Sequence, residues 1–365
     1  MGVLLDKYSG SFTWFSLRPP NTDVENPYTI PYSHVDHLRR PARFPGLRQY
    51  LNLGPWARSA GREAAAFGRA QNVDVVLADL ALEAVVAGRV AARILKVPLL
   101  ASVKDDPVNR IRVKGTPAWL VKWFDTQFAK TMRTADKCAV IGNAMGEVYQ
   151  RRYGVETTTL FIGVEKDKCL PARALDRDKA PFVIGSVGSV NYADNWNLLV
   201  EALRLLNQKY GSGRFRLLHI GRLPDGLQVT DDVAVTGWVP EKEFVFHLSR
   251  LDAGFLNYSF APAHAETGRT SFPLKTHSYI QAQIPMLALG PADSSSVRFV
   301  EEYQCGVVCA EADAGTLAAR LERLFFQKNV YTEAQAAVEQ LTRLFSREQF
   351  FQTFESFVRV ANKSN

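Results

Sequence analysis

The sequence lacks any run of the roughly 18 consecutive apolar residues that a membrane-spanning helix requires. Met1 is not followed by a basic and then apolar leader. The four cysteines stand apart, with no CxxC pair and no His/Cys cluster of zinc spacing, and no repeat or low-complexity tract is present. These absences argue against a membrane span, an exported protein and a zinc scaffold, so we expect a cytoplasmic protein with reduced cysteines.

What is present is a chain of 365 residues with 47% hydrophobic content, enough for two cores of nucleotide-binding-domain size. Its net charge of +7 favours anionic partners such as nucleotides, acidic lipid headgroups or nucleic acid. No basic run or nucleic-acid-binding motif accompanies this charge, so we predict no nucleic-acid partner.

Short apolar strands alternate with helices in both halves of the chain, which predicts an α/β protein with two doubly wound, Rossmann-like domains and parallel sheets. In the first half the predicted strands are 12–17, 73–78, 97–102, 138–141 and 158–162, and the helices are 47–70, 82–95, 117–133 and 144–153. In the second half the strands are 182–187, 215–220, 233–236, 253–258, 285–289 and 307–309, and the helices are 195–209, 241–249, 274–283, 294–304 and 314–325.

We place the N-terminal domain at residues 1–164, a linker at 165–180, the second domain at 181–330 and C-terminal helices at 331–365. The first domain opens without the strand and glycine-rich turn that usually begin a Rossmann-like half, so we expect that strand to be missing. The C-terminal tail has too many phenylalanines for a free surface helix, and we expect it to pack back toward the first domain.

The segment 251–291 combines two apolar strands, a loop of small and polar residues, and a helix opened by Phe272-Pro273. This is the pattern of a βαβ crossover with polar residues at the carboxyl end of its first strand. Ligands bind at that end of open α/β sheets, where backbone amides and a helix N-terminus can meet an anion. The segment therefore predicts a phosphate-bearing ligand.

Several motifs follow one order along most of the chain, from about Val73 to the tail. They are VDVVLA at 73–78, VPLL at 97–100 and ADKCAVIGNAM at 135–145, then GSVG at 185–188, HIG at 219–221, VTGWVP at 235–240 and FPLKTHSYIQAQIP at 272–285. In their order and spacing they resemble the GT-B glycosyltransferases. Within that fold the chain is similar to the large retaining, family 4-like group, which includes sucrose and glycogen synthases and bacterial cell-surface polysaccharide enzymes.

The resemblance implies two domains that face each other across a cleft, the N-terminal one presenting an acceptor and the C-terminal one binding a nucleotide-sugar. Positive charge and helix dipoles would stabilise the departing diphosphate without a metal. We therefore expect a hexosyltransferase with no cofactor that acts on a polysaccharide or lipid-linked acceptor. A nucleotide-sugar epimerase and a GT-B-like binding or scaffold subunit without turnover stay open as alternatives.

The first candidate donor-binding residue is Lys275, because a lysine in the first turn of a helix opposes the helix dipole and is best explained by a bound anion. Before it, Gly268, Arg269, Thr270 and Ser271 could form an anion-binding nest, although a polar loop with a helix cap explains them as well. Further candidates at strand ends have an ordinary turn or a solvated side chain as the alternative explanation: Gly188, Ser189 and Arg222.

The chain departs from the family at its charged donor-site positions. By register, Ser189 and Asp194 stand where the family has an arginine and a lysine, and Thr270 and Ser278 stand where it has the two glutamates of a Glu-x7-Glu element. The resemblance then leaves Lys275, Arg269 and Glu266 as the residues that could bind the donor in their place.

In the first half, Asp105 is the candidate base or hydroxyl-orienting residue, with Asp106 as the alternate. The Asp-Asp-Pro sequence is also a common turn and helix start, so a purely structural role is the alternative. The two carboxylates are adjacent and isolated, so we predict no metal site. The stretch from Arg110 to Lys130 combines basic and aromatic residues, which fits either a peripheral contact with the inner face of the membrane or a core-facing helix.

Overall fold

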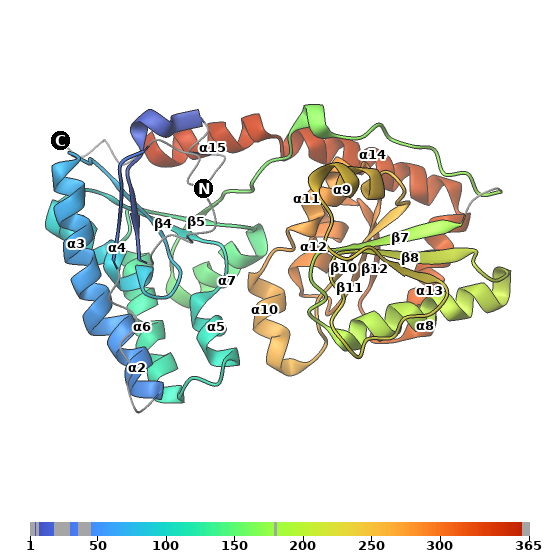
Figure 1. Cartoon of the computed structure of the whole chain (residues 1–365), viewed down its shortest axis with the longest axis horizontal. Coiled ribbons are helices and arrows are strands. Elements are labelled where there is room, and N and C mark those ends of the chain that lie inside the picture. The colour runs from blue at the N-terminus through green and yellow to red at the C-terminus, as the bar shows by residue number, and fades with distance from the viewer. Residues whose placement is uncertain (1–3, 5–6, 18–29, 36–44, 179–180, 360–365) are drawn as a thin grey trace. The chain divides into compact units, whose positions relative to one another are not determined.

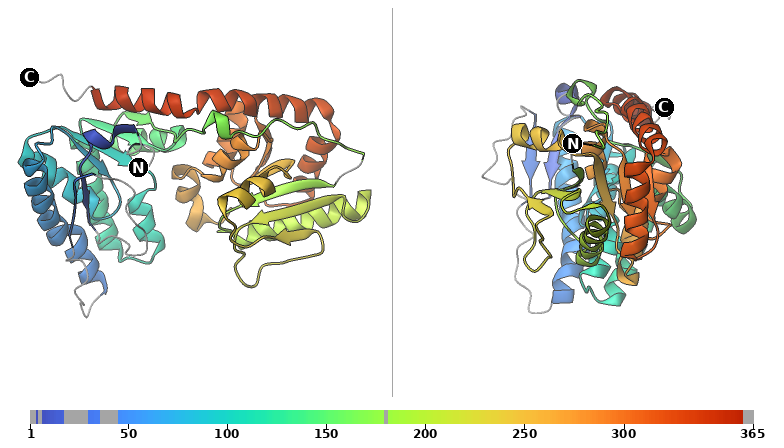
Figure 2. Two further views of the ribbon diagram at one scale, coloured as in Figure 1. Left: turned by 45° about the horizontal axis from the view of Figure 1, so that its top comes forward. Right: turned by 90° about the vertical axis from the view of Figure 1, so that its right-hand side faces the viewer.

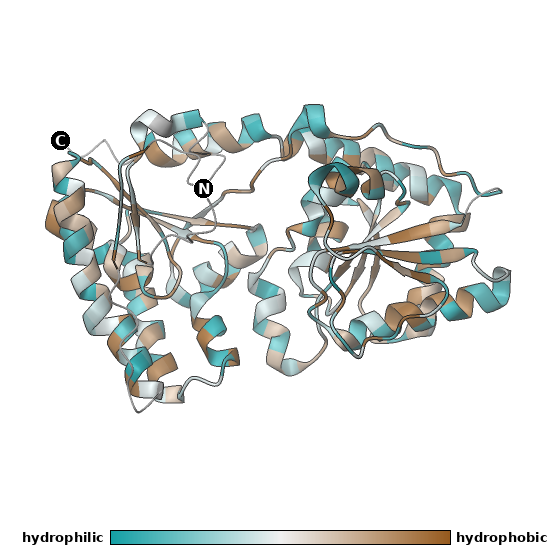
Figure 3. Ribbon diagram, in the orientation of Figure 1, coloured by the Kyte–Doolittle hydropathy of each residue, from teal (hydrophilic) through white to brown (hydrophobic). Residues whose placement is uncertain are grey.

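The structure is a computed structural model that describes residues 4, 7–17, 30–35, 45–178 and 181–359. The chain divides into two compact units: unit 1 comprises Met1–Thr159 with Glu355–Asn365, and unit 2 comprises Leu160–Phe354. Each unit is built on a parallel β-sheet covered by helices (Figure 1). The strands are apolar along most of their length (Figure 3), as expected of sheets buried on both faces. The fold is α/β, as the alternation of strands and helices predicts.

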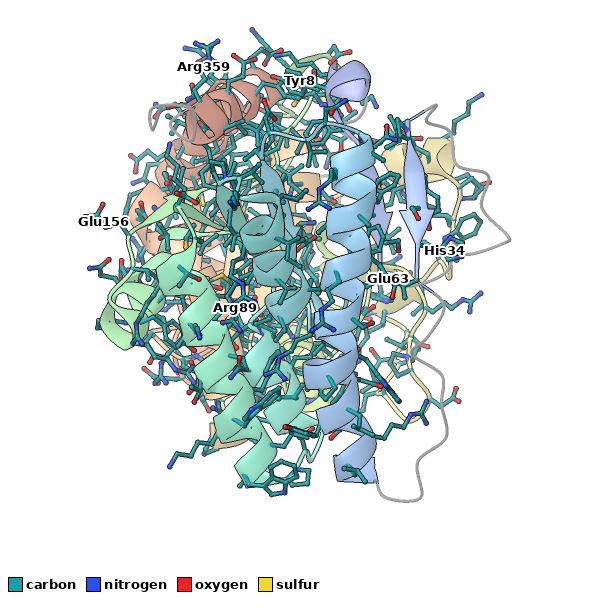
Figure 4. All side chains as sticks on the ribbon, turned by 90° about the vertical axis from the view of Figure 1, so that its left-hand side faces the viewer. Tyr8, His34, Glu63, Arg89, Glu156 and Arg359 are labelled. Atoms are coloured by element: carbon teal, nitrogen blue, oxygen red, sulfur yellow. The ribbon has the colours of Figure 1, made fainter. Side chains whose placement is uncertain are left out.

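Unit 1 has a four-stranded parallel sheet of order β3-β4-β5-β6 and a separate parallel pair, β1-β2. Its strands are β1 Trp14–Ser16, β2 Tyr32–His34, β3 Val76–Asp79, β4 Leu99–Val103, β5 Lys137–Val140 and β6 Thr157–Thr159. Its helices are η1 Ser9–Ser11, α2 Pro45–Leu51, η2 Asn52–Trp56, α3 Ala57–Ala70, α4 Ala84–Leu95, α5 Pro107–Val113, α6 Ala118–Thr134 and α7 Asn143–Tyr153. Arg89, labelled in Figure 4, joins α4 to α6 through hydrogen bonds to the side chain and carbonyl of Gln127.

Two elements of unit 1 differ from the sequence prediction. The expected helix at 47–70 contains the π-helical segment η2, which holds Pro55; a proline cannot donate the regular helical hydrogen bond and clashes with the preceding turn. Strand β2 was not predicted, because three residues are too short to show a two-residue period, and it forms by pairing with β1.

Unit 2 has a six-stranded parallel sheet of order β12-β11-β10-β7-β8-β9. Its strands are β7 Phe182–Val187, β8 Phe215–Ile220, β9 Val233–Val235, β10 Ala253–Asn257, β11 Met286–Leu289 and β12 Gly306–Cys309. Its helices are η3 Lys166–Lys168, α8 Ala193–Tyr210, α9 Glu241–Leu248, η4 Pro262–His264, α10 Ala265–Thr270, α11 Lys275–Gln281, α12 Ser295–Tyr303, α13 Ala314–Phe326 and α14 Lys328–Leu344.

The sheet of unit 2 separates two apolar clusters. Alternate residues of β7 point to opposite faces, so Phe182 and Ile184 pack with α8 and α13, while Val187 packs with residues of α11, α12 and α14. Figure 2 shows α8 running along the sheet. These two clusters hold the strand ends of unit 2 in fixed positions.

The region expected to be a polar loop between β10 and α11 is largely helical, and that expectation was wrong for residues 262–270. It forms η4 and α10. Helix α10 lies next to the start of α12: Gly268 faces Ser294, and the Ser295 hydroxyl donates to the Ser271 carbonyl directly after α10. Glycine and short polar residues do not predict a helix, so tertiary packing decides this one.

The tail consists of α14 and α15, Arg347–Arg359. Between them Phe345 packs in unit 2 against Phe161 and Tyr303, with ring centroids 4.1 and 5.5 Å apart. The last part of α15 belongs to unit 1, where Lys137 Nζ donates to the carbonyl of Ser356 and lies over the ring of Phe357. In the part of the chain that the structure describes, no helix is both long and apolar enough to cross a membrane.

Candidate functional site

The strand order of unit 2 marks where a ligand would bind. The chain passes from β7 outward through β8 to β9, then returns to the other side of β7 at β10 and continues through β11 to β12. Strands β7 and β10 are neighbours whose following helices leave in opposite directions. In open α/β sheets this switch point leaves a crevice at the carboxyl ends of the strands, where ligands bind. The candidate site is therefore the edge formed by the residues after β7, β8 and β10.

The backbone at this edge is closely packed and rich in glycine. Gly188 directly follows β7 with a φ of +77°, which a glycine adopts without strain. Gly221 follows β8, and a Cβ there would lie 2.6 Å from the Gly188 carbonyl oxygen. The close approach of the two strand ends therefore requires glycine at position 221, while Gly188 is favoured by its positive φ. The loop from Gly188 leads into α8, whose 18 residues direct a positive dipole end toward this edge.

Lys275 lies beside the same loop. Its Nζ donates to the Ser189 carbonyl oxygen at 3.4 Å, a long and weak hydrogen bond. The side chain is half-buried by surface area, yet it is surrounded by enough protein to lower the pKa of its ammonium group to about 8, because burial penalises the charge. The predicted Lys275, Gly188 and Ser189 are therefore brought together, around a cation held by a single weak acceptor in the described contacts.

Two residues that sequence reasoning did not select shape this edge. His219, fully buried on β8, lies 3.2 Å from Ser186 Oγ through Nδ1 and 3.3 Å from the Arg222 carbonyl through Nε2. Burial lowers the pKa of His219, so we assign it a positioning role as a neutral side chain. Asn195, buried in the first turn of α8, donates to the Tyr258 carbonyl at 2.8 Å and so joins the start of α8 to the end of β10. The sequence signal available for Asn195 was an asparagine at the start of the predicted helix 195–209.

The residues predicted to form a nest lie in or after α10. Arg269 Nε is paired with Asp293 Oδ2 at 2.6 Å, and Thr270 is buried with its hydroxyl donating to the Glu266 carbonyl at 2.7 Å. The Ser271 amide donates to Thr267, and the Ser271 carbonyl accepts a hydrogen bond from Ser295. The segment is therefore a short helix and not the open loop that was expected, and Arg269, Thr270 and Ser271 already have partners in the described contacts.

The other predicted donor residues remain at the surface of the site. Ser278 lies three residues after Lys275 on α11, so the two share a helix face. Arg222 follows β8 and Glu266 lies in the first turn of α10; Arg222 is exposed and Glu266 half-buried. Trp238, after β9, is 75% exposed, which is unusual for so large an apolar side chain.

In unit 1, Asp105 and Asp106 follow β4 with different surroundings. Asp105 is exposed. Asp106 is buried and caps α5, its Oδ1 accepting from the amides of Val108 and Asn109 at 2.9 and 2.8 Å. Its Oδ2 lies 3.9 Å from Nη1 of Arg152. Asp106 thus has the structural role that the Asp-Asp-Pro pattern left open.

Among the described residues, no group of three or more His, Cys, Asp or Glu side chains is placed to hold a metal ion. The chemistry that the described site itself supplies is a partly desolvated cation, a helix N-terminus and hydroxyl groups. Such a set suits binding of a phosphate or diphosphate.

Neither the comparison with protein-family models nor that with curated sequences finds a match. Solved structures of similar fold do exist. Trehalose 6-phosphate synthase from Burkholderia multivorans has a TM-score of 0.64 and 13% identity, covering 98% of this chain and 93% of its own. Anabaena HepE, solved with UDP and glucose, has a TM-score of 0.61 and 14% identity over 90% and 86% of the two chains. A UDP-N-acetylglucosamine 2-epimerase from Listeria monocytogenes, described as putative, has a TM-score of 0.55 and 11% identity over 93% and 85%.

The fold of this chain therefore matches that of GT-B glycosyltransferase structures along nearly its whole length. At these identities the likeness concerns the fold alone. The expected division into two Rossmann-like halves is consistent with that fold.

Proposed function

We propose that the protein is a glycosyltransferase that moves a hexosyl group from a nucleotide-sugar donor to a polysaccharide or lipid-linked acceptor. The observation that carries the proposal is the position of Lys275 beside the Gly188–Ser189 loop at the switch point of unit 2. The likeness in fold to a trehalose 6-phosphate synthase, and to a protein solved with UDP and glucose, supports the same donor class.

In this proposal the diphosphate lies between Lys275 and the N-terminus of α8. The ammonium and the helix dipole attract the negative charge that develops on the leaving diphosphate, so the transfer requires no metal ion. The Ser278 hydroxyl, on the Lys275 face of α11, is placed to donate to the same ligand. Arg222 and Glu266 are further donor-site residues, while Arg269 and Thr270 contribute by holding α10 in place.

The nucleobase of the donor is proposed to stack on Trp238. Strand β9 is two strands from β7, which is about 10 Å along the sheet edge at roughly 4.8 Å per strand. That span suits a nucleoside whose diphosphate lies at the switch point. An exposed indole provides a flat apolar surface, and stacking of a base on an aromatic side chain contributes about 1–3 kcal/mol.

The acceptor is proposed to bind unit 1, with the exposed Asp105 as the residue that orients or deprotonates its hydroxyl. Asp106 is left out of the chemistry because its carboxylate already caps α5. Retention of configuration remains an implication of the family resemblance and is testable on the product.

Binding and turnover test the proposal separately. UDP, GDP, ADP and dTDP would be titrated by calorimetry into the wild type, the Lys275→Met variant and a control, Lys328→Met, whose exposed lysine lies on α14. We expect one nucleotide to bind and the Lys275 variant alone to lose it. The matching nucleotide-sugar is then incubated with sugar, polysaccharide and lipid-linked acceptors, and nucleotide release is measured. Failure of every nucleotide to bind refutes the donor site, while binding without release of nucleotide supports a scaffold subunit.

A nucleotide-sugar epimerase is the second candidate, favoured by the similar fold of the Listeria 2-epimerase. Its elimination chemistry needs carboxylates beside the sugar. In the described contacts, Asp293 is held by Arg269, and hydroxyl residues stand at positions 270 and 278. Conversion of the nucleotide-sugar into an isomer without any acceptor would establish the epimerase instead.

A further inference from the structure

Unit 1 carries a strongly basic surface formed by two segments far apart in sequence. Residues 45–62 and 107–124 contain no Asp or Glu. The carboxylates next to them along the chain are Glu63, Asp105, Asp106 and Asp125, each within two residues of a segment end. The two segments contain seven cationic residues, all exposed: Arg48, Arg58, Arg62, Arg110, Arg112, Lys114 and Lys122. We call this surface the basic tip.

Contacts between α2, η2 and α6 bring the two segments together. A Cβ on Gly46 would lie 3.3 Å from Pro117, and one on Gly54 would lie 3.1 Å from the ring of Trp123. The ring of Tyr50 meets that of Trp123 in an edge-on contact with centroids 5.0 Å apart. Figure 1 shows α2, the α5–α6 connection and the first turn of α6 at the same end of unit 1.

The basic tip also exposes large apolar side chains. Leu47 is 48% exposed, Val113 50% and Trp119 56%, each from a different helix. Gly115, in the turn after α5 with a φ of +73°, has open space around it. Exposed apolar groups that are surrounded by polar or charged side chains are typical of a surface that contacts a protein or a membrane.

The apolar stripe of α6 is buried inside unit 1, so it is not available to a partner. Leu120, Phe124 and Phe128 form this stripe and are fully buried in unit 1. The stripe is therefore a core-facing surface, which was the alternative interpretation of residues 110–130. Among the large apolar side chains described on α6, the exposed one is Trp119 in the first turn, whose ring centroid lies 6.0 Å from that of Tyr50 on α2.

We propose that the basic tip docks unit 1 on an anionic lipid bilayer. Trp119, Leu47 and Val113 insert at the level of the headgroups, where indole rings are favoured, and the surrounding arginines and lysines lie against acidic headgroups. Lys and Arg stems also cover apolar surface while their charges stay in water, so they tolerate this boundary. Nucleic acid fits the charge but gives no role to the exposed leucine and valine, so the bilayer is the better-matched partner.

Sedimentation with vesicles tests the proposal on the full chain. We expect binding to vesicles of 30% phosphatidylglycerol in phosphatidylcholine and little binding to phosphatidylcholine alone. Each cation near an anionic membrane surface adds about fivefold in affinity, so Arg112→Gln with Lys114→Gln should weaken binding roughly 20- to 30-fold. Trp119→Ser with Leu47→Ser should remove the part of the binding that survives 0.5 M salt.

Matched controls make the result specific. Arg323→Gln with Lys328→Gln removes two exposed cations from unit 2, and Leu344→Ser removes an exposed leucine there; these variants should bind vesicles like the wild type. Circular dichroism and urea unfolding verify that each variant is folded. Absence of wild-type binding to anionic vesicles, equal loss in the controls, or binding to duplex DNA in place of vesicles would each overturn the proposal.

Discussion

The titration of Lys275 should be visible in the binding of a nucleoside diphosphate. Burial holds the pKa of Lys275 at about 8 in the free protein, below its ordinary value near 10.5. A bound diphosphate favours the charged form and should return the pKa toward that ordinary value. Binding then requires the protonated lysine, so affinity is constant below pH 8 and falls as the pH rises above it.

The size of the effect follows from the two pKa values. While the bound form stays protonated, affinity falls by up to about tenfold for each pH unit above 8. Between pH 7.5 and 9.5 the dissociation constant should therefore rise roughly 20-fold. The terminal phosphate of the ligand is already ionised over this range, since its second pKa is near 6. Calorimetry in two buffers of different ionisation enthalpy should detect proton uptake on binding at pH 9.

Two variants separate this linkage from other effects of pH. Lys275→Met should bind more weakly at pH 7.5, since a charge pair about 4 Å apart is worth about 1 kcal/mol in water and about 4 kcal/mol near a protein surface. Its affinity should be flat from pH 7.5 to 9.5. Lys275→Arg should bind the nucleoside diphosphate more tightly than Lys275→Met does, because arginine stays charged. Its affinity should also be independent of pH from 7.5 to 9.5. A flat profile in the wild type, or a Lys275→Met variant that binds as tightly as the wild type, would refute the reasoning.

Further predictions address single contacts. Asp106→Ala should destabilise unit 1 by about 1–2 kcal/mol through loss of the α5 cap, while Asp106→Asn should retain most of that stability in urea unfolding. Gly254→Ala should destabilise unit 2 by roughly 3 kcal/mol, because its Cβ would lie 2.2 Å from the Tyr279 ring; a change below 1 kcal/mol in urea unfolding would contradict this packing. Trp238→Ala should weaken nucleoside diphosphate binding about 5- to 150-fold in calorimetry and leave pyrophosphate binding unchanged. Phe246→Ala, which removes another exposed aromatic, should change neither, and equal loss of pyrophosphate binding in Trp238→Ala would refute stacking.

The strands of unit 2 could be predicted well because their apolar runs are bounded by polar turns. Strands β7 and β8 have the predicted bounds, and β10 and β11 are each one residue shorter than predicted. Helix α10 could not be predicted, since its contacts come from residues distant in sequence, such as the Ser295 hydroxyl that donates to the Ser271 carbonyl 24 positions away. Local propensity carries no information about such a contact.

The candidate site was only partly visible in the sequence for the same reason. Lys275 could be selected because a lysine in a first helical turn conflicts with the dipole. Its proximity to Ser189 depends on β7 and β10 being neighbours, and strand order is a tertiary property. Arg269 and Thr270 were selected for their chemistry alone, and the structure shows that Asp293 and the Glu266 carbonyl already satisfy them.

The excess positive charge of the chain separates into two different kinds of anion recognition. At the proposed donor site one partly desolvated lysine acts with a helix dipole, and charges in such surroundings are weakly screened by salt. At the basic tip seven exposed cations act together, each one weak and strongly screened. Net charge alone cannot distinguish these cases, because it counts Lys275 and Lys114 equally. Burial distinguishes them: it makes Lys275 selective for a compact diphosphate, while the solvated cations of the tip suit an extended anionic surface.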